Sequence, residues 1–207
     1  MKRPEPKIWL SADLHLGHVN IIHYCSRSFM NVDDMASSLL KPYRELKPWD
    51  TVYLLGDLVF MKDSIPWMPK FPPKTYLLKG NHDRGTPEGY QRANVSVIDG
   101  QEMEIEWNGE RFLLTHDPAP ILRNEGKRIG LNLDSCAWDD PIILQLAEEL
   151  PVRVLCGHVH RLFRRLGRIV NVGVDVWDYR PILIEDAIKA FMEPSGLLSG
   201  IEHRRQF

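Results

Sequence analysis

The chain has 207 residues, of which 43% are hydrophobic, and its formal net charge is −2 at pH 7. This composition excludes an intrinsically disordered chain and predicts a single domain, residues 1–207, with a substantial hydrophobic core. The near-neutral charge provides no global basic field, so it gives no support for nucleic acid or an anionic membrane as a partner.

Three cysteines, Cys25, Cys136 and Cys156, match neither a C-x-x-C metal site nor a disulfide framework. We interpret them as reduced thiols and expect a cytoplasmic protein. The opening stretch MKRPEPKIWL is not apolar enough for a signal peptide, and no segment approaches the roughly 20 apolar residues of a membrane span.

Short apolar runs that end in Gly, Asn or Asp predict buried strands, whereas helical spacing of apolar residues predicts helices. In chain order, we expect a strand over 7–13, a short helix over 19–25, an amphipathic helix over 33–46 that Pro42 disturbs, and strands over 51–57 and 74–83. Residues 95–117 are typical of two or three strands, with an Asn-Gly hairpin turn in WNGE.

The second half of the chain begins with 117–140, the longest segment that we expect to be irregular, and such loops are usually functional or mobile. Beyond it we expect a helix over 141–150, a buried strand over 152–160, strand, turn and strand over 164–177, and a strand that becomes a helix over 181–192. Together these elements predict a mixed α/β fold with two packed sheets and helices outside.

Residues of metal-ligand type follow many of these strands. They are Asp13, His15, Asp57, Asn81, His82, Asp83, His116, His158 and His160. In an extended chain side chains alternate, so Asp13 and His15 would point the same way. Strand ends in a layered α/β fold converge on one edge, where ligands usually bind. Each motif alone is more often a turn or a cap, but their combination predicts a metal or catalytic site.

In this order, the motifs D-x-H, G-D, G-N-H-D, a later His and G-H-x-H resemble the calcineurin-like metallophosphoesterase superfamily. The match spans residues 13–160 and continues in Asn171-Val172-Gly173. The phrases DLHLGHVNII and NVGVDVWDYRP resemble those of small bacterial and phage phosphoesterases. The resemblance implies the metallo-dependent phosphatase fold, a four-layer α/β/β/α sandwich of two mixed sheets.

The resemblance also implies two divalent metal ions. Asp13, His15, Asp57 and His160 would bind the first ion, and Asp57, Asn81, His116 and His158 the second, with Asp57 bridging. Nitrogen and oxygen ligands without a thiolate fit manganese, our first expectation, or iron, zinc or nickel, rather than a structural zinc. Two carboxylates and a bridging hydroxide leave the site positive, which favours a phosphate oxygen as a further ligand.

Catalytic roles follow from the same resemblance. His82 would lie beside the metals and protonate or stabilise the leaving group while the metal-bridging hydroxide attacks phosphorus in line. Gly80 would let the backbone turn tightly. Asp83 is a candidate for orienting His82, or is a turn or capping residue. His18, Arg27 and Arg161 are candidates for binding the substrate phosphate, with a solvated surface position as the alternative.

The residue after His116 departs from the superfamily, which often has His-Gly where this chain has His116-Asp117. Asp117 would repel phosphate, accept a hydrogen bond from a ligand histidine, or face solvent. These are open alternatives at the level of sequence.

We therefore expect a metal-dependent phosphoric ester hydrolase acting on a phosphate-ester small molecule or a nucleotide. A phosphodiester is favoured, because the chain is too short for a large cap domain and an open site admits larger substrates. The alternatives are a phosphomonoesterase of the same superfamily and a non-catalytic scaffold that uses the metal cleft for binding. The scaffold is less favoured because all the ligand positions and His82 are present.

Overall fold

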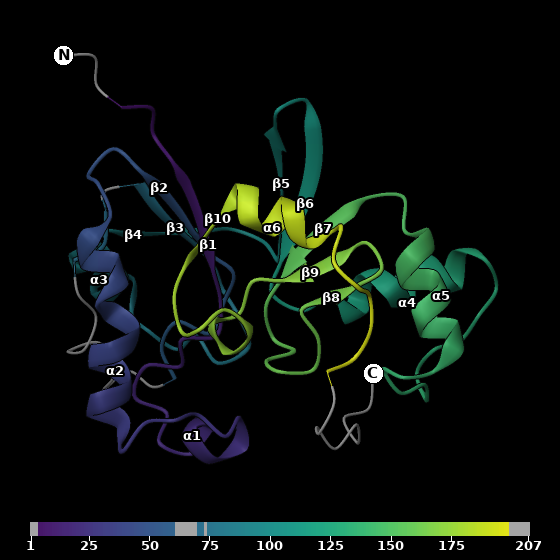
Figure 1. Ribbon diagram of the computed structural model, residues 1–207, viewed down its shortest axis with the longest axis horizontal. Helices are drawn as coiled ribbons and strands as arrows, with labels where there is room; N and C mark the ends of the chain where they lie inside the picture. Colours follow the sequence, from purple (N-terminus) through teal and green to yellow (C-terminus); the bar gives the residue numbers. More distant parts are fainter. Residues whose placement is uncertain (1–3, 61–69, 73, 199–207) are drawn as a thin grey trace.

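The computed structural model describes residues 4–60, 70–72 and 74–198. Two five-stranded sheets follow one another along most of the chain (Figure 1). The first has the order β10-β1-β2-β3-β4 and consists of β1 (Ile8–Ser11), β2 (Thr51–Leu54), β3 (Lys74–Leu78), β4 (Val95–Ile98) and β10 (Ile182–Leu183). β1 to β4 are parallel, and β10 is antiparallel to β1. The carboxyl ends of β1, β2 and β3 therefore share one edge.

The second sheet has the order β5-β6-β7-β9-β8. It consists of β5 (Glu102–Trp107), β6 (Glu110–Thr115), β7 (Arg153–Cys156), β8 (Arg165–Leu166) and β9 (Ile169–Asn171). β6, β7 and β9 are parallel, whereas β5 and β8 are antiparallel to their neighbours. Both sheets are thus mixed, as predicted.

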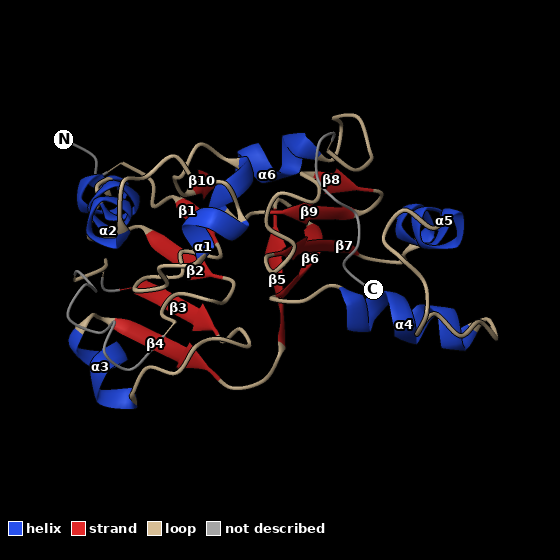
Figure 2. Cartoon of the chain, turned by 90° about the horizontal axis from the view of Figure 1, so that it is seen from below, coloured by secondary structure: helices blue, strands red, loops and turns tan. Residues whose placement is uncertain are grey.

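Helices flank the paired sheets (Figure 2). Three hydrophobic clusters of side chains fill the interfaces between layers. One cluster joins the first sheet to α1 (Ile21–Tyr24), α2 (Val32–Leu40), the 3₁₀ turn η1 (Pro42–Glu45) and α3 (Pro87–Arg92). Another joins the second sheet to α4 (Ala119–Arg128) and α5 (Pro141–Glu149). The third lies between the sheets and includes residues of α6 (Ile184–Ala190). The four-layer α/β/β/α prediction is confirmed.

Most local predictions are also confirmed. The WNGE turn has positive φ at Asn108 (51°) and Gly109 (79°), as a type I′ hairpin requires. Residues 181–192 begin as β10 and continue as α6. The segment 164–177 forms β8 and β9 as expected, but its end folds into the 3₁₀ turn η3 (Val174–Val176) instead of extending the strand.

The prediction of an irregular segment over 117–140 is wrong for its first half. Residues Ala119–Arg128 form α4, with Ala119, Leu122 and Gly126 buried. Pro118 and Pro120 lie at the start of this helix, where a missing amide hydrogen costs nothing. The short helix α3 was not predicted, although Thr86 caps it and Pro87 begins it.

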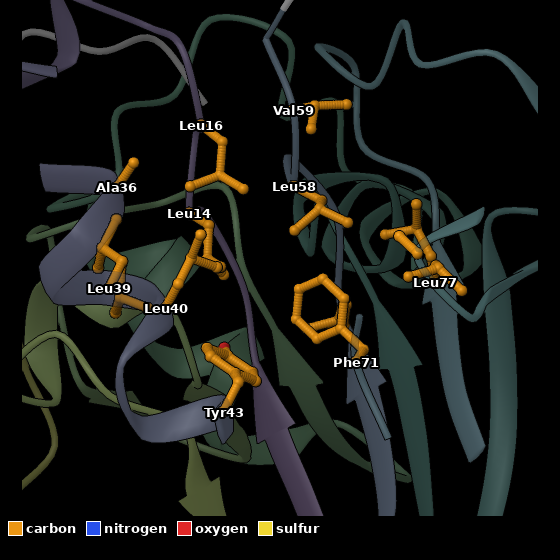
Figure 3. Packing of buried hydrophobic residues seen from close by; sticks show 14 of the residues in the cluster. Leu14, Leu16, Ala36, Leu39, Leu40, Tyr43, Leu58, Val59, Phe71 and Leu77 are labelled. Carbon is orange, nitrogen blue, oxygen red and sulfur yellow. The ribbon is translucent and has the colours of Figure 1, made fainter. Parts of the chain in front are cut away.

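The loops that follow β1 and β2 are anchored in the core by leucine and valine side chains. Leu14, Leu16, Leu58 and Val59 are fully buried. Figure 3 shows them in one cluster with side chains of α2, including Leu39. The loop residues between and before them are the predicted metal ligands, so the core holds the backbone of the candidate site.

Candidate metal centre

Five of the predicted ligands have left-handed backbone conformations. Their φ angles are 61° at Asp13, 52° at His15, 54° at Asp57, 70° at His158 and 48° at His160. Such conformations cost on the order of 1 kcal/mol or more each for residues other than glycine, and they concentrate at functional sites. The expectation that Asp13 and His15 continue an extended strand is therefore wrong, since β1 ends at Ser11.

Backbone pairing fixes these strained loops. The amide of Asp13 donates to the carbonyl oxygen of Gly56 at 3.1 Å, and the amide of His15 donates to that of Asp57 at 2.8 Å. The amide of Leu16 donates in turn to the carbonyl oxygen of Leu58 at 3.0 Å. The loop after β1 thus pairs with the loop after β2, which brings the D-x-H and G-D motifs together.

One group of donor atoms belongs to Asp13, His15 and His160, whose ligand atoms all lie within 4.8 Å of one another. Both ring nitrogens of His15 are buried and lack a hydrogen-bond partner. Nε2 of His15 lies 3.3 Å from Oδ2 of Asp57. Burial, followed by the positive charge of His160, lowers the pKa of His15 well below its usual value. A neutral, unpartnered, buried imidazole is well suited to bind a metal ion.

A second group forms around Nε2 of His116. Nδ1 of this ring lies 2.8 Å from the carbonyl oxygen of Leu55, which fixes the ring. Nε2 then faces Oδ1 of Asn81 at 3.0 Å, Nδ1 of His158 at 3.2 Å and Oδ2 of Asp57 at 3.4 Å. Oδ2 of Asp57 is therefore close to both His15 and His116, the position that a bridging ligand requires.

The donors fit divalent metal ions. Asp13, Asp57 and His116 form a further group whose ligand atoms lie within 4.8 Å of one another. Oxygen and imidazole donors without a thiolate suit borderline and hard divalent ions. Burial would raise the pKa of Asp57, but the hydrogen bond and charge of His116 hold it well below the usual range, so this carboxylate is ionised. The structure thus brings together residues that can hold a metal ion.

His82 lies beside these groups. Its amide donates to Oδ1 of Asp57 at 2.9 Å. Its ring centroid is 5.4 Å from that of His15 and 5.3 Å from that of Phe60. The side chain is half-buried, so one part of it remains open to solvent.

Gly80 makes room for the neighbouring ligands. A turn does follow it, with the amide of Asp83 3.4 Å from its carbonyl oxygen, but its own φ lies outside the left-handed region. A Cβ at this position would lie 2.2 Å from Oδ1 of Asp57 and 2.8 Å from Nε2 of His116. Close approach, rather than unusual backbone torsion, therefore requires glycine here.

The carboxylate of Asp83 joins two loops of the candidate site through hydrogen bonds. It accepts amide hydrogens from Asp57 at 2.7 Å, Leu58 at 2.9 Å, Val59 at 3.1 Å and Gly80 at 2.9 Å. The hydroxyl of Tyr90 donates to it at 3.3 Å. These contacts tie the G-D loop to the G-N-H loop, which favours the turn alternative over the orientation of His82.

The three candidates for substrate contact lie in different environments. His18 is 8% exposed and stacks on Phe60, with ring centroids 3.7 Å apart and an interplanar angle of 7°. Its ring lies 6.2 Å from that of His82, so it borders the site. Arg161 is exposed, donates to the carbonyl oxygen of Cys25 at 3.2 Å and lines a cavity of 580 Å³.

The prediction that Arg27 binds the substrate phosphate is wrong. It is 4% exposed, and each nitrogen of its guanidinium donates to a carboxylate or carbonyl oxygen of the protein. A side chain so placed cannot also contact a substrate phosphate, because its donors are already used. Arg27 instead belongs to the support of the site.

Asp175 is a further site residue that the sequence analysis missed. Its Oδ2 lies 2.8 Å from Nδ1 of His160, and its side chain is 0% exposed. Burial would raise the pKa of Asp175, but the charges of Arg27 and His160 hold it well below the usual range. The signal was present as a lone acidic residue within the apolar run VGVDVW, since a buried charge requires a partner.

Asp117 accepts the amide hydrogen of Ala119 at 2.9 Å, at the start of α4. This contact with the first turn of the helix is none of the three alternatives that the sequence left open for Asp117.

A cavity of 830 Å³ lies away from these donors and is lined by Trp9, Trp49 and Asp50 among others. It lies at the beginning of β1 and β2, whereas open α/β sheets bind ligands at the carboxyl ends of their strands. Donor chemistry, not cavity size, identifies the candidate site. Within the described part of the chain, no helix is long and apolar enough to cross a membrane.

No family model matches the chain. The chain is 27% identical over 196 residues to an uncharacterised protein of Methanocaldococcus jannaschii, covering 88% of this chain and 90% of that protein. A solved protein of unknown function from Aquifex aeolicus is 23% identical, has a TM-score of 0.62 and is matched over 89% of this chain and 99% of its own. This chain shares the fold of the Aquifex protein.

Phosphoesterases are also among the solved structures that resemble this chain, at low identity. One is a novel archaeal phosphodiesterase, 15% identical with a TM-score of 0.42 over 86% of this chain and 99% of that chain.

Proposed function

We propose that the chain is a binuclear metal-dependent phosphoesterase of the calcineurin-like type that hydrolyses a phosphodiester. The observation that carries the proposal is the convergence of Asn81, His158 and Asp57 on Nε2 of His116, beside the unpartnered nitrogens of His15. Buried polar atoms normally have partners, so the buried ring nitrogens of His15, which have none, support a cation at this cluster.

Asp13, His15, Asp57 and His160 would hold the first ion, and Asp57, Asn81, His116 and His158 the second. When bound, two divalent ions would supply Lewis acidity to the phosphoryl group and activate a water molecule. Manganese is our first choice, with iron, zinc or nickel as alternatives. The two carboxylates, Asp13 and Asp57, neutralise only part of the charge of two divalent ions, which favours an anionic substrate.

His82 is the proposed acid for the leaving group. The bond from its amide to Asp57 fixes its backbone against the bridging carboxylate, while the half-buried ring can reach a bound ester. A proton held at the imidazole would pass to the departing alcohol, or the imidazolium would stabilise its charge. Asp83 supports both loops from behind and holds them in register.

A phosphodiester, nucleotide-type substrate is favoured over a monoester. Phe60 stacks on the buried ring of His18 and is itself half-buried, so it offers a partly exposed aromatic surface beside His82. Such a surface suits the organic alcohol of a diester, because aromatic rings stack on apolar groups and nucleobases. A phosphomonoesterase and a non-catalytic metal-binding scaffold are the alternatives. The proposal also includes a single domain and a cytoplasmic location. The location is supported by the three cysteines, which form no disulfide.

The test compares bis-(p-nitrophenyl) phosphate with p-nitrophenyl phosphate on protein stripped of metal and reloaded with Mn²⁺, Ni²⁺, Zn²⁺ or Mg²⁺. We expect metal-dependent turnover with preference for the diester. Asp57→Asn should lose metal and turnover together, whereas His82→Ala should retain metal and lose roughly 10²–10⁴-fold in kcat. His23→Ala, an exposed histidine of α1, is the matched control and should behave as wild type.

Three results of this assay would change the proposed function. A higher rate on the monoester would replace the substrate proposal with a phosphomonoesterase. Metal uptake without turnover on either ester would favour the binding scaffold. Failure to take up any of the four metals would overturn the proposal as a whole.

A further inference from the structure

A buried ion pair lies behind the candidate metal centre. Nε of Arg27 donates to Oδ1 of Asp175 at 2.8 Å, and Nη2 donates to Oδ2 at the same distance. Both side chains are 0% exposed. Such a two-point contact between a guanidinium and a carboxylate fixes the orientation of both groups. The pair has no net charge, so it can approach the site without opposing metal binding.

Asp175 reaches the site through His160. Its Oδ2 lies 2.8 Å from Nδ1 of that histidine, so Nδ1 is engaged and Nε2 is the nitrogen that remains for a ligand role. His160 is also the ligand candidate grouped with Asp13 and His15. A carboxylate that holds one ring nitrogen of a metal-binding histidine selects its tautomer and makes the other nitrogen more basic.

Arg27 also contacts the backbone of the loop that carries Asp13 and His15. Nη2 donates to the carbonyl oxygen of Asp13 at 2.7 Å, and Nη1 donates to that of Leu14 at 3.1 Å. These carbonyls belong to the loop in which Asp13 and His15 have left-handed backbones. One guanidinium therefore holds the D-x-H loop directly and the G-H-x-H loop through Asp175.

We propose that Arg27 and Asp175 are positioning residues that set the affinity of the first metal position, held by Asp13, His15, Asp57 and His160. The inference rests on the proposed binuclear centre. It is specific to that position, because Nδ1 of His116 at the second position is hydrogen-bonded to the backbone carbonyl oxygen of Leu55 at 2.8 Å, whereas Oδ1 of Asp13 lies 3.9 Å away, beyond hydrogen-bond distance. Loss of the pair should therefore weaken binding of the first metal ion and leave binding of the second unchanged.

The experiment is calorimetric titration of Mn²⁺ into metal-free protein, with the bound metal counted independently. Wild type should bind two ions per chain. Asp175→Asn keeps the side-chain volume but removes the charge, and it should weaken one site roughly 10- to 100-fold while the other changes less than about twofold. Equal affinities in wild type and variant, or equal weakening of both sites, would overturn the inference while leaving the binuclear centre intact.

A second variant guards against misfolding. Asp175→Asn leaves the buried Arg27 without its counter-charge, which destabilises the fold. The double variant Arg27→Gln/Asp175→Asn removes both charges and should show the same selective weakening. Asp50→Asn is the control, because Asp50 is also buried and accepts hydrogen bonds from Trp9, Lys7 and Lys47 at the opposite end of the strands. Both metal affinities should be unchanged there.

A spectroscopic measurement on wild type needs no variant of the pair. In metal-loaded protein with ¹⁵N-labelled histidine, the proton of His160 should reside on Nδ1, with Nε2 bound to metal. A proton on Nε2 would overturn the positioning role. Absence of binding by wild type of Mn²⁺, Ni²⁺, Zn²⁺ and Mg²⁺ alike would overturn both this inference and the proposed function, so the two failures are distinguishable.

Discussion

Nε2 of His116 lies 3.0 Å from Oδ1 of Asn81. When the ring is neutral and its Nδ1 donates to the carbonyl oxygen of Leu55, both of these atoms are hydrogen-bond acceptors, so they repel each other. A proton on Nε2 or a cation between the atoms turns this repulsion into attraction. Burial lowers the pKa of His116, but Asp57 and Asp13 outweigh it and raise the pKa to about 9. In metal-free protein a proton therefore takes the place that a metal would occupy.

Metal binding should consequently release protons. The pKa of His116 is raised to about 9 and that of His160 to about 10, so both rings are protonated at neutral pH in metal-free protein. A metal must displace these protons, and its apparent affinity should rise about tenfold per pH unit for each one displaced. The gain in metal affinity should end once the pH exceeds the pKa values of His116 and His160.

Titration of Mn²⁺ in buffers of different ionisation enthalpy counts the released protons. The His116→Gln variant should release one proton fewer than wild type. Affinity that stays constant between about pH 6.5 and 8.5 would contradict this assignment of the protons.

Gly80→Ala should remove the second metal position. The added methyl group would lie 2.2 Å from Oδ1 of Asp57 and 2.8 Å from Nε2 of His116, which forces these donors apart. We expect a folded protein whose turnover falls by at least about 10²-fold, since misplacement of about 1 Å at a reacting centre has that effect. Metal counting and circular dichroism check this.

Gly130→Asn is the matched glycine control. A Cβ at Gly130 meets nothing within 4 Å, and asparagine tolerates its φ of 83°. Its metal content and turnover should match wild type. Wild-type metal affinity in Gly80→Ala would show that the two donors can move without loss.

Asp83→Ala should destabilise the fold and the site together. It leaves the amides of Asp57, Leu58, Val59 and Gly80 without their acceptor, and buried donors to a charged partner contribute about 1.5–3 kcal/mol each. We expect unfolding free energy to fall by at least about 3 kcal/mol in urea titrations. Tyr90→Phe removes a single bond to the same carboxylate and should cost about 1 kcal/mol. Similar losses in the two variants would refute the anchoring role.

The metal-ligand candidates were predictable because each lies shortly after the end of a buried strand. Asp57 comes after β2 and Asn81 after β3, and parallel pairing places these strand ends on one edge. Local sequence carries that information, since strand and ligand are adjacent in the chain.

The supports of the site were not predictable in the same way. Arg27 and Asp175 are separated by 148 positions, and the sequence contains no pattern that pairs them. The anchoring bonds of Asp83 run to backbone amides, which every residue has, so the identities of its partners leave no trace in the sequence. The extended backbone assumed for Asp13 was wrong because tertiary bonds override the local preference for φ below zero.

The core beneath the site leads to the last prediction. Leu58 follows Asp57, the proposed bridging carboxylate, and is fully buried, as is Leu39 of α2 in the same cluster (Figure 3). Truncation of either leucine to alanine should cost about 2–5 kcal/mol of unfolding free energy. Only Leu58→Ala should also weaken metal binding, because the cavity lies directly under the loop that holds Asp57. Urea titration and metal affinity, measured on both variants, separate the two effects. Equal metal affinity in Leu58→Ala and Leu39→Ala would mean that the hydrogen bonds of Asp83, and not core packing, keep the carboxylate of Asp57 in place.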